Sequence, residues 1–406
     1  MKTVWYISKY FEQKNKGSNG GRGWCLLYEL VKRGYNATVI TSDSNVLAET
    51  PVLDNSFKID DVDGVQVVWL RTLKYTIAKS LLRVLSWFHF EWQLFKLDKK
   101  ILNPPDVVVV SSISLLTILN GFLIKRKFKC SLVFEIRDIW PLTLVEEGGF
   151  SRRNPLIILL ALVEKLGYKH ADVIIGTMPN LLEHVNNILG YEKPVYCIPM
   201  GVDVNNYRSI ISLEKGYKDT YLSSDKVKIV YAGTIGITNA LDVFFEAAKH
   251  LEGNKDIEFI IVGDGPLRER YIKLYGNLNN LVFAPKVNKN SVQSVLNECD
   301  IVCFSAYPSK VWNYGQSLNK LIDYMSSGKP IIASYTGFKS MINESGCGSF
   351  VPAGDVLALV SEIKYYAALS GEERSAIGQK GKEWLFENRS YEKLACEFED
   401  VIFNGQ

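Results

Sequence analysis

The sequence predicts an α/β protein with two doubly wound parallel sheets, one in each half of the chain. Short runs of β-branched and aromatic residues alternate with amphipathic helical segments, which is typical of such sheets. The alternation stops in a polar stretch at 204–225 and then starts again. The 406 residues are enough for two full cores. We therefore expect two Rossmann-like domains, over 1–204 and 205–388.

In the first half, each expected strand is a short apolar run, and the helix at 24–33 ends at Gly34. The uncharged stretch 107–124 is near the lower length limit for a membrane span. Its serines, Asn120 and Gly121 favour a buried strand followed by a helix instead. The expected strands are 2–8, 36–41, 65–70, 106–110, 131–136, 172–176 and 195–198, and a long helix covers 76–102.

The second half repeats this order. Two of its strands run directly into glycine-rich turns, at Gly233 and at Gly263. The expected strands are 228–231, 257–262, 280–284, 300–304 and 330–333, with helices at 239–250, 371–388 and 391–403.

Composition excludes several classes of protein. A net charge of +3 is too small to indicate a nucleic-acid partner. The seven cysteines form no C-x-x-C pair and the four histidines lack ligand spacing, so neither a zinc site nor a disulfide framework is expected. The N-terminus lacks the apolar core of a signal peptide, and a reducing cytoplasm is the expected compartment. Asp61-Val62-Asp63 has the letters of a metal-binding Asp-x-Asp motif, but it lies in a polar turn before Gly64. We therefore expect no obligatory metal.

The stretch 314–332 carries the clearest chemical signal, because it combines a polar loop, a helix and a buried strand. Ser317 is the expected N-cap, and Gly328 ends the helix. The free N–H groups and the positive dipole end of such a helix favour a phosphate, and Lys320 adds a charge there. Asp323, one turn deeper, is a candidate acceptor for ribose hydroxyls.

This stretch resembles the donor-nucleotide helix of retaining GT-B glycosyltransferases in the glycogen-synthase-like superfamily (glycosyltransferase family 4). It is most similar to bacterial N-acetyl-L-fucosamine transferases, with the pattern Ser-Pro-Asn-Lys-Leu-x-Glu-Tyr-Met. Here Leu318 replaces the proline and Asp323 replaces the glutamate, while Asn319 is retained. Gln316 stands where the wider superfamily has the first Glu of Glu-x7-Glu. The resemblance implies a nucleotide-sugar domain at 205–388 and an acceptor domain at 1–204, onto which the last helix, about 389–406, packs back.

The glycine-rich segment 17–23 follows the first strand and opens a helix. Glycines let a backbone approach a ligand closely, and in GT-B enzymes this loop faces the donor diphosphate and the acceptor. The resemblance thus makes Gly20, Gly21 and Arg22 binding candidates, although a flexible turn would explain the glycines as well. The segment lacks a strict dinucleotide fingerprint, and Asp43 is an ambiguous partner acid, so a NAD-dependent dehydrogenase is a minor alternative.

An acid and a base stand together after the expected strand 131–136. Arg137-Asp138-Ile139-Trp140-Pro141 resembles the Arg-Asp-x-Trp-Pro phrase of the fucosamine-transferase group. That resemblance makes Asp138 and Arg137 the catalytic candidates, with Asp138 accepting from a sugar or acceptor hydroxyl and Arg137 steadying negative charge. The alternative is a buried pair that locks the end of the strand.

Gly233 and Thr234 are the expected diphosphate contacts of the second domain. Many relatives place an Arg and a Lys here, so the positive charge must come from Lys320 first, with Arg268 or Lys286 next. Lys286 also follows the strand whose end, in relatives, contacts the nucleobase. The turn at 263–266 is expected to serve the chain path alone.

The segment 76–102 carries many aromatic and basic residues, which suits either an anionic membrane surface or a core helix with basic ends. The expected enzyme transfers an N-acetylamino sugar, for example N-acetyl-L-fucosamine, from a UDP-sugar to a polyprenyl-diphosphate-linked saccharide in O-antigen or capsule assembly. We expect no cofactor, and a cytoplasmic protein peripheral to the inner face of the membrane. The alternatives are an epimerase similar to UDP-N-acetylglucosamine 2-epimerase and an inactive sugar-nucleotide-binding scaffold.

Overall fold

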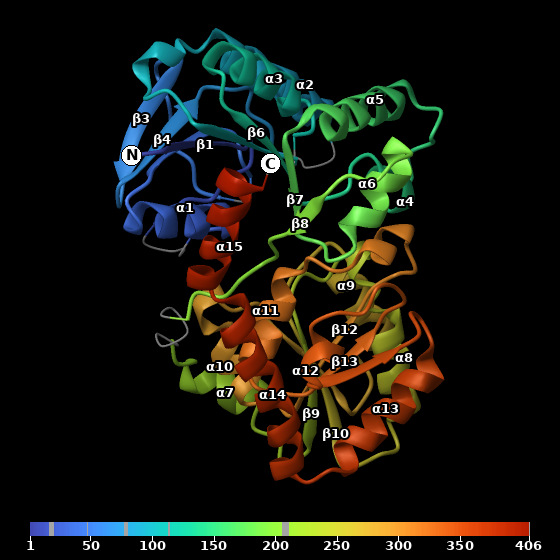
Figure 1. Ribbon diagram of the computed structural model, residues 1–406. Coiled ribbons are helices and arrows are strands. Elements are labelled where there is room, and N and C mark those ends of the chain that lie inside the picture. The colour runs from blue at the N-terminus through green and yellow to red at the C-terminus, as the bar shows by residue number, and fades with distance from the viewer. Residues whose placement is uncertain (16–19, 47, 77–79, 113, 205–210, 406) are drawn as a thin grey trace. The chain divides into compact units, whose positions relative to one another are not determined.

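A computed structural model describes residues 1–15, 20–46, 48–76, 80–112, 114–204 and 211–405 (Figure 1). The chain divides into two compact units. Unit 1 comprises Met1–Pro199 together with Tyr391–Gln406, and unit 2 comprises Met200–Ser390. Both have the α/β organisation that the alternating sequence predicts.

Unit 1 is built on a sheet that has eight strands in the described residues, in the order β3-β4-β2-β1-β5-β6-β7-β8. Every neighbouring pair is parallel except β3 with β4. The central strands are buried on both faces, which explains their continuous apolar runs. The strands are β1 (Thr3–Ile7), β2 (Asn36–Ser42), β3 (Phe57–Val62), β4 (Val65–Leu70), β5 (Val107–Ser111), β6 (Ser131–Ile136), β7 (Val173–Gly176) and β8 (Val195–Cys197).

Helices cover this sheet, and the last helix of the chain is one of them. Leu394, Phe398 and Ile402 of that helix are fully buried in the same core as the first helix of the chain. The helices of unit 1 are α1 (Arg22–Lys32), α2 (Leu81–Lys96), α3 (Thr117–Phe128), α4 (Leu142–Glu146), α5 (Pro155–His170), α6 (Leu181–Leu189) and α15 (Tyr391–Asn404), with a 3-10 turn η1 (Lys99–Ile101).

Unit 2 has a sheet with the order β11-β10-β9-β12-β13-β14, and its described pairs are all parallel. The chain leaves β9 toward β10 on one side and returns to β12 on the other, so the strand order reverses beside β9. Such a reversal opens a crevice at the carboxyl ends of the strands. The strands are β9 (Val227–Ala232), β10 (Ile257–Val262), β11 (Leu281–Ala284), β12 (Ile301–Ser305), β13 (Ile331–Ser334) and β14 (Gly348–Val351).

The helices of unit 2 follow its strands in turn. They are α7 (Lys215–Tyr221), α8 (Asp242–His250), α9 (Arg268–Tyr275), α10 (Val292–Asn297), α11 (Asn319–Ser326), α12 (Ile342–Ser345), α13 (Val356–Ala368) and α14 (Gly371–Arg389), with 3-10 turns η3 (Ile237–Asn239), η4 (Lys289–Ser291) and η5 (Lys310–Tyr314).

The structure differs from the expectation in two added strands and one shortened helix. The strand β3 was not expected, because its mostly exposed residues on an antiparallel edge show no apolar pattern. The short strand β14 was missed for a similar reason, since only Val351 in it is fully buried. The expected helix at 76–102 is shorter: α2 ends at Lys96, while residues 77–79 lie outside the described part. Within the described residues, no helix combines the length and apolarity needed to cross a bilayer.

Candidate active site

A cavity of about 870 Å³ lies at the crevice of unit 2. Its walls come from the turns after β9 and β10, from the segment after β11 with α10, and from the front of α11. Seven of the predicted binding residues line it: Gly233, Thr234, Lys286, Leu318, Asn319, Lys320 and Asp323. Residues that are far apart in the sequence thus meet at the carboxyl ends of parallel strands, as ligand sites in such sheets do.

Two glycine-rich turns form one wall of this cavity by running against each other. The N–H of Gly233 donates to the carbonyl of Val262 at 2.9 Å, and the N–H of Ile235 donates to the carbonyl of Asp264 at 2.9 Å. A Cβ on Gly263, whose φ is +152°, would stand 1.9 Å from the carbonyl oxygen of Gly233. Only glycine permits this approach, so the wall is made of backbone.

The helix α11 is held in place by a tyrosine. The buried hydroxyl of Tyr324 donates to the carbonyl of Ala232 at 2.8 Å and accepts from its N–H at 3.1 Å. This pair of bonds fixes the helix to the end of β9. The prediction of Ser317 as N-cap was wrong: the helix starts at Asn319, and Leu318 is the N-cap without any side-chain bond. Ser317 does not line the cavity.

Lys320 projects from the first turn of α11 into the cavity. Its ammonium donates to Asn239 Oδ1 and to the Tyr231 hydroxyl at 3.3 Å, and it lies 5.0 Å from the centre of the Tyr231 ring. Burial lowers the pKa of Lys320 to about 8. Among the described residues, no carboxylate lies within ion-pair distance of this ammonium. A half-buried cation held by neutral partners leaves room for an anionic ligand.

The neutral partners of Lys320 are themselves fixed. Asn239 Nδ2 donates to the carbonyl of Thr234 at 2.8 Å, and the Tyr231 hydroxyl donates to the same carbonyl at 2.7 Å. Ser305 Oγ in turn donates to the carbonyl of Asn239 at 2.7 Å. Asn239 therefore orients the lysine of α11.

The other expected cations differ in their surroundings. Lys286 lines the cavity but is exposed, 3.8 Å from a carboxylate oxygen of Asp264. Arg268 lies 3.6 Å from Glu269 and does not line the cavity. Lys320 is thus the better placed of the three.

Sequence reasoning missed part of the cavity. Gly263, Asp264 and Gly265 line it, although their turn was expected to serve only the chain path. Val292 and Val295, one turn apart on α10, add an apolar side. The available signal was the Gly-x-Gly at 263–265, directly after a strand. Its relevance depends on that strand lying beside β9, where the strand order reverses, and the sequence does not show the sheet order.

In unit 1 the glycine-rich loop precedes α1, and its residues 17–19 lie outside the described part. Gly20 has φ +85°, and Gly21 is the N-cap, whose N–H donates to the carbonyl of Glu12 at 2.9 Å. Arg22 was expected to face the donor diphosphate, but its side chain is buried. Its guanidinium is fully buried and donates to the carbonyls of Pro199 and Ile198 at 3.0 and 2.7 Å.

The remaining partner of Arg22 is Glu135, also fully buried. Burial alone would raise the pKa of Glu135, but the charges of Arg22 and Arg137 outweigh it and hold that pKa below its usual range. Tyr6 donates its hydroxyl to the same carboxylate. Arg137, a predicted catalytic residue, therefore acts electrostatically on a buried ion pair in this structure.

Asp138 is bonded within its own turn. Its two carboxylate oxygens accept from Trp140 Nε1 at 2.9 Å and from Thr143 Oγ1 at 2.6 Å. These contacts hold the end of β6 to α4. Arg137 and Asp138 are both only half-buried, so they are not the buried pair that the sequence offered as the alternative.

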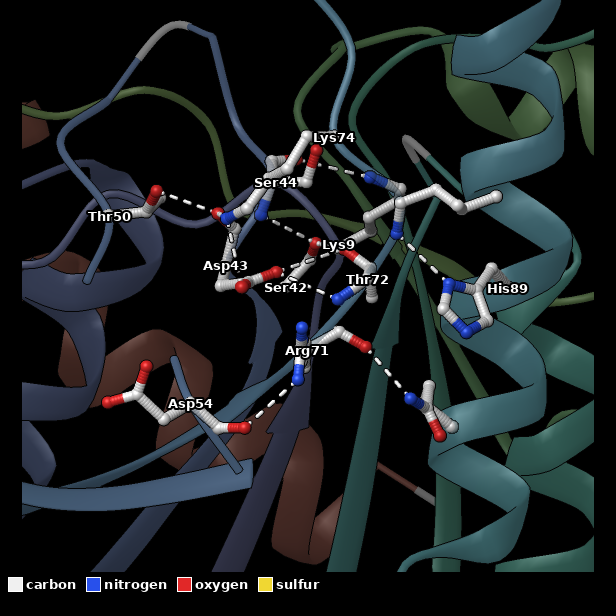
Figure 2. Close-up of polar contacts among 12 residues, drawn as sticks. Lys9, Ser42, Asp43, Ser44, Thr50, Asp54, Arg71, Thr72, Lys74 and His89 are labelled. Carbon is white, nitrogen blue, oxygen red and sulfur yellow. Dashed lines mark hydrogen bonds and ion pairs between the residues drawn. The ribbon is translucent and has the colours of Figure 1, made fainter. Parts of the chain in front are cut away.

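A second polar cluster stands where β2 and β4 of unit 1 end (Figure 2). Asp43 accepts from the N–H of Thr72 at 2.8 Å and forms an ion pair with Lys74 at 2.9 Å. Lys9 is buried and donates to the carbonyl of Ser44 at 3.2 Å, and burial lowers its pKa to about 7. Asp43 is buried and already bonded, which does not suit the exposed ribose-binding acid of a dehydrogenase.

The described residues contain no cluster of three or more His, Cys, Asp or Glu side chains that could hold a metal ion.

Comparison with protein families identifies both halves of the chain. Residues 226–368 match the glycosyl transferases group 1, and residues 25–206 match glycosyltransferase family 4. The first match contains the cavity, and the second contains most of unit 1. No curated protein sequence matched the chain.

Solved structures agree on the fold. Sucrose-phosphate synthase from Thermosynechococcus elongatus is 15% identical, with 99% of this chain and 98% of that chain covered and a TM-score of 0.71. Anabaena Alr3699/HepE in complex with UDP is 14% identical, with 99% of each chain covered and a TM-score of 0.63. WaaG, a glycosyltransferase involved in lipopolysaccharide biosynthesis, is 14% identical, with 99% and 100% covered and a TM-score of 0.65.

These structures share the arrangement expected from the sequence, two α/β domains with parallel sheets. The family matches add the activity class, since both are glycosyltransferase domains. The chain therefore has the GT-B fold and is a glycosyltransferase.

Proposed function

We propose that the donor is a UDP-sugar bound in the cavity of unit 2, with its diphosphate at the front of α11. The observation that carries this proposal is Lys320, a half-buried ammonium that projects into the cavity and whose partners in the described part of the chain are neutral. The N–H groups at the start of the helix add a positive dipole end. Structures of Anabaena HepE with UDP and with UDP-glucose support the choice of nucleotide.

The cavity also has the parts that a nucleoside needs. The apolar side chains of Val287, Val292 and Val295 offer a surface for a base, and Asp323 offers a carboxylate to ribose hydroxyls. The sugar is an N-acetylamino sugar in this proposal, for example N-acetyl-L-fucosamine, on the strength of the resemblance around 317–325.

The proposed reaction retains the anomeric configuration. An acceptor hydroxyl attacks the anomeric carbon on the face that the diphosphate leaves, the bond from that carbon to the diphosphate breaks, and the hydroxyl proton passes to the departing phosphate. Lys320 and the backbone N–H groups stabilise the charge that develops on the diphosphate. No residue is assigned as a covalent nucleophile.

The proposed acceptor is a polyprenyl-diphosphate-linked saccharide used in O-antigen or capsule assembly, met at the cytoplasmic face of the inner membrane. The aromatic and basic residues of α2 support this location. WaaG offers a precedent for a glycosyltransferase in lipopolysaccharide biosynthesis with this fold.

The first experiment is isothermal titration of the purified protein with UDP, GDP and NAD in the absence of added metal. We expect UDP to bind and NAD to give no signal. Binding of GDP in preference to UDP would contradict the donor class, and binding of NAD alone would contradict the whole reading of the cavity.

A second experiment separates an enzyme from an inactive scaffold. UDP release is measured with a panel of UDP-sugars, with and without lipid-linked saccharides. We expect release that depends on the acceptor. Tight UDP binding without release from any donor would favour a scaffold.

A further inference from the structure

One face of unit 1 carries large apolar side chains in contact with solvent. On α2, the residues Leu81, Leu85, Phe88, Trp92 and Phe95 are all exposed, with Leu81 at 82% and Phe95 at 57%. Their spacing of four, three, four and three residues places them in one stripe along the helix. The buried residues of the same helix, such as Trp87, Phe90 and Leu94, lie on the opposite side.

Two neighbouring helices extend this face. The helix α3 packs against both α2 and α5. Leu119 and Leu123 are exposed on α3. Four more large residues are exposed on α5: Ile158, Leu159, Leu162 and Leu166, with Leu162 at 58%. We refer to the exposed apolar residues of these three helices as the apolar face.

The helix α2 is a firm support for this face. His89 Nδ1 accepts from the N–H of Leu73 at 3.0 Å, as drawn in Figure 2. Gln93 Nε2 donates to the carbonyl of Arg71 at 2.9 Å, and Trp87 Nε1 donates to the Tyr10 hydroxyl at 2.9 Å. The inner side of the helix is thus bonded to the rest of unit 1, and its outer apolar stripe is left to solvent.

Basic side chains predominate among the charged residues of these helices that contact solvent. The two acids in them point inward: Glu91 is bonded by Thr117 and Asn120, and Glu164 is bonded by Tyr168 and His184. Apart from Glu91, their exposed or half-buried charged side chains are basic: Arg83, Lys96, Lys125, Arg126, Lys127, Lys165 and Lys169. Of these, Arg83 contacts Tyr10 and Trp87 on the inner side of α2, and Lys125 forms an ion pair with Asp172. The whole chain has 47 basic and 44 acidic residues, so this imbalance is local.

We propose that the apolar face docks on an anionic lipid bilayer. Exposed aromatic and aliphatic side chains enter the boundary between headgroups and acyl chains, while the surrounding basic side chains meet anionic headgroups. A second copy of this chain is the less suitable occupant. A symmetric dimer through this face would bring two basic surfaces together, and like charges repel.

This proposal adds a defined membrane-docking surface to the proposed function. It rests on that function in one respect, the membrane-bound acceptor. It is tested without donor or turnover, by cosedimentation of the full chain with phosphatidylcholine vesicles that contain or lack phosphatidylglycerol. We expect binding to the anionic vesicles that weakens as salt is raised, and much weaker binding to the neutral ones.

Variants locate the surface. Trp92→Glu with Phe95→Glu should weaken vesicle binding roughly tenfold or more, because two anchors are lost and two acids are added. The matched control is Leu357→Glu with Tyr365→Glu on α13 of unit 2, where the two replaced side chains are also more than half exposed. This control variant should bind vesicles as the parent does. Arg126→Gln with Lys127→Gln should weaken binding to anionic vesicles about 25-fold, at about fivefold for each charge.

Three outcomes would overturn the proposal. One is absence of binding to either vesicle by a protein that binds UDP, which would leave the donor proposal standing. Another is equal loss in the α2 and α13 variants. The third is a dimer, seen by light scattering, that Trp92→Glu with Phe95→Glu dissociates. Vesicle binding by a protein that fails to bind UDP would instead contradict the proposed function and leave the docking face intact.

Discussion

The two units use the same α/β plan but treat a buried cation in opposite ways. In unit 1, Arg22 opens the helix after the first strand, and its charge is met by the buried carboxylate of Glu135. In unit 2, Lys320 lies in the first turn of α11, and among the described residues its ammonium donates to Asn239 and Tyr231. Both residues follow loops where such folds bind anions.

The difference separates a structural charge from a binding charge. A cation with an internal carboxylate is already neutralised, and removing it would leave an unpaired buried anion. A cation with neutral partners gains its strongest interaction from a ligand that arrives later. A charged residue in a sequence motif is therefore not identified as a binding residue by its charge alone. Whether the protein itself supplies an oppositely charged partner distinguishes a structural charge from a binding charge. The following variants test this contrast, beginning with the largest expected effect.

Arg22→Met should lower the free energy of unfolding of unit 1 by about 3–5 kcal/mol, because Glu135 is left buried and unpaired. Urea unfolding followed by circular dichroism measures the change. The double variant Arg22→Met with Glu135→Leu should recover at least half of the loss. If the single variant instead kept its stability and lost ligand affinity, Arg22 would be a binding residue.

Lys320→Met should weaken UDP binding by about 1–3 kcal/mol, as expected for a lost bond to a charged group. Its effect on stability should be small, since no buried carboxylate loses a partner. Isothermal titration gives the affinity, and Lys286→Met, an exposed cation on the same cavity, is the control with a smaller expected loss. Equal affinities of Lys320→Met and the parent would remove Lys320 from the site.

The affinity for UDP should depend on pH through Lys320. Burial lowers its pKa to about 8, so the ammonium is charged below that pH and loses its charge as the pH rises through it. Above pH 8 we expect the binding constant to fall by up to about tenfold per pH unit. The control is Lys320→Met, whose UDP-binding constant should vary less over the same pH range. Any effect of pH on UDP itself is the same for both proteins and cancels in the comparison. Parallel curves for the two proteins would contradict the role of the ammonium.

Asp138→Asn and Thr143→Val should each reduce stability by about 1 kcal/mol, because each removes a bond that holds the turn between β6 and α4. Neither should change UDP affinity, since neither residue lines the cavity. If Asp138→Asn abolished turnover while Thr143→Val did not, Asp138 would be catalytic as the resemblance implies, rather than structural.

Much of the fold was predictable because buried parallel strands are continuous apolar runs. The strands β4, β6 and β10 have the predicted bounds. Elements without an apolar pattern were not predictable, as β3 shows: its pairing with β4 holds it in place while its side chains face solvent.

The candidate site divides in the same way. Lys320 and Asp323 were predicted from a helix pattern, which is a local property of the sequence. The participation of Gly263 and Gly265 was missed, because it depends on the turn after β10 lying against the turn after β9. The burial of Arg22 was missed for the same reason, since its partners lie more than a hundred residues away along the chain.

The sequence by itself determined the α/β class, the two-domain plan and the helix that carries Lys320, because periodicity and turn residues act over a few neighbours. The tertiary structure decided which charges are neutralised, which turns meet at the cavity, and that the acids of α2 and α5 point inward while their apolar stripes face out. These are properties of distant residues brought together by the sheet order, and no local pattern encodes that order.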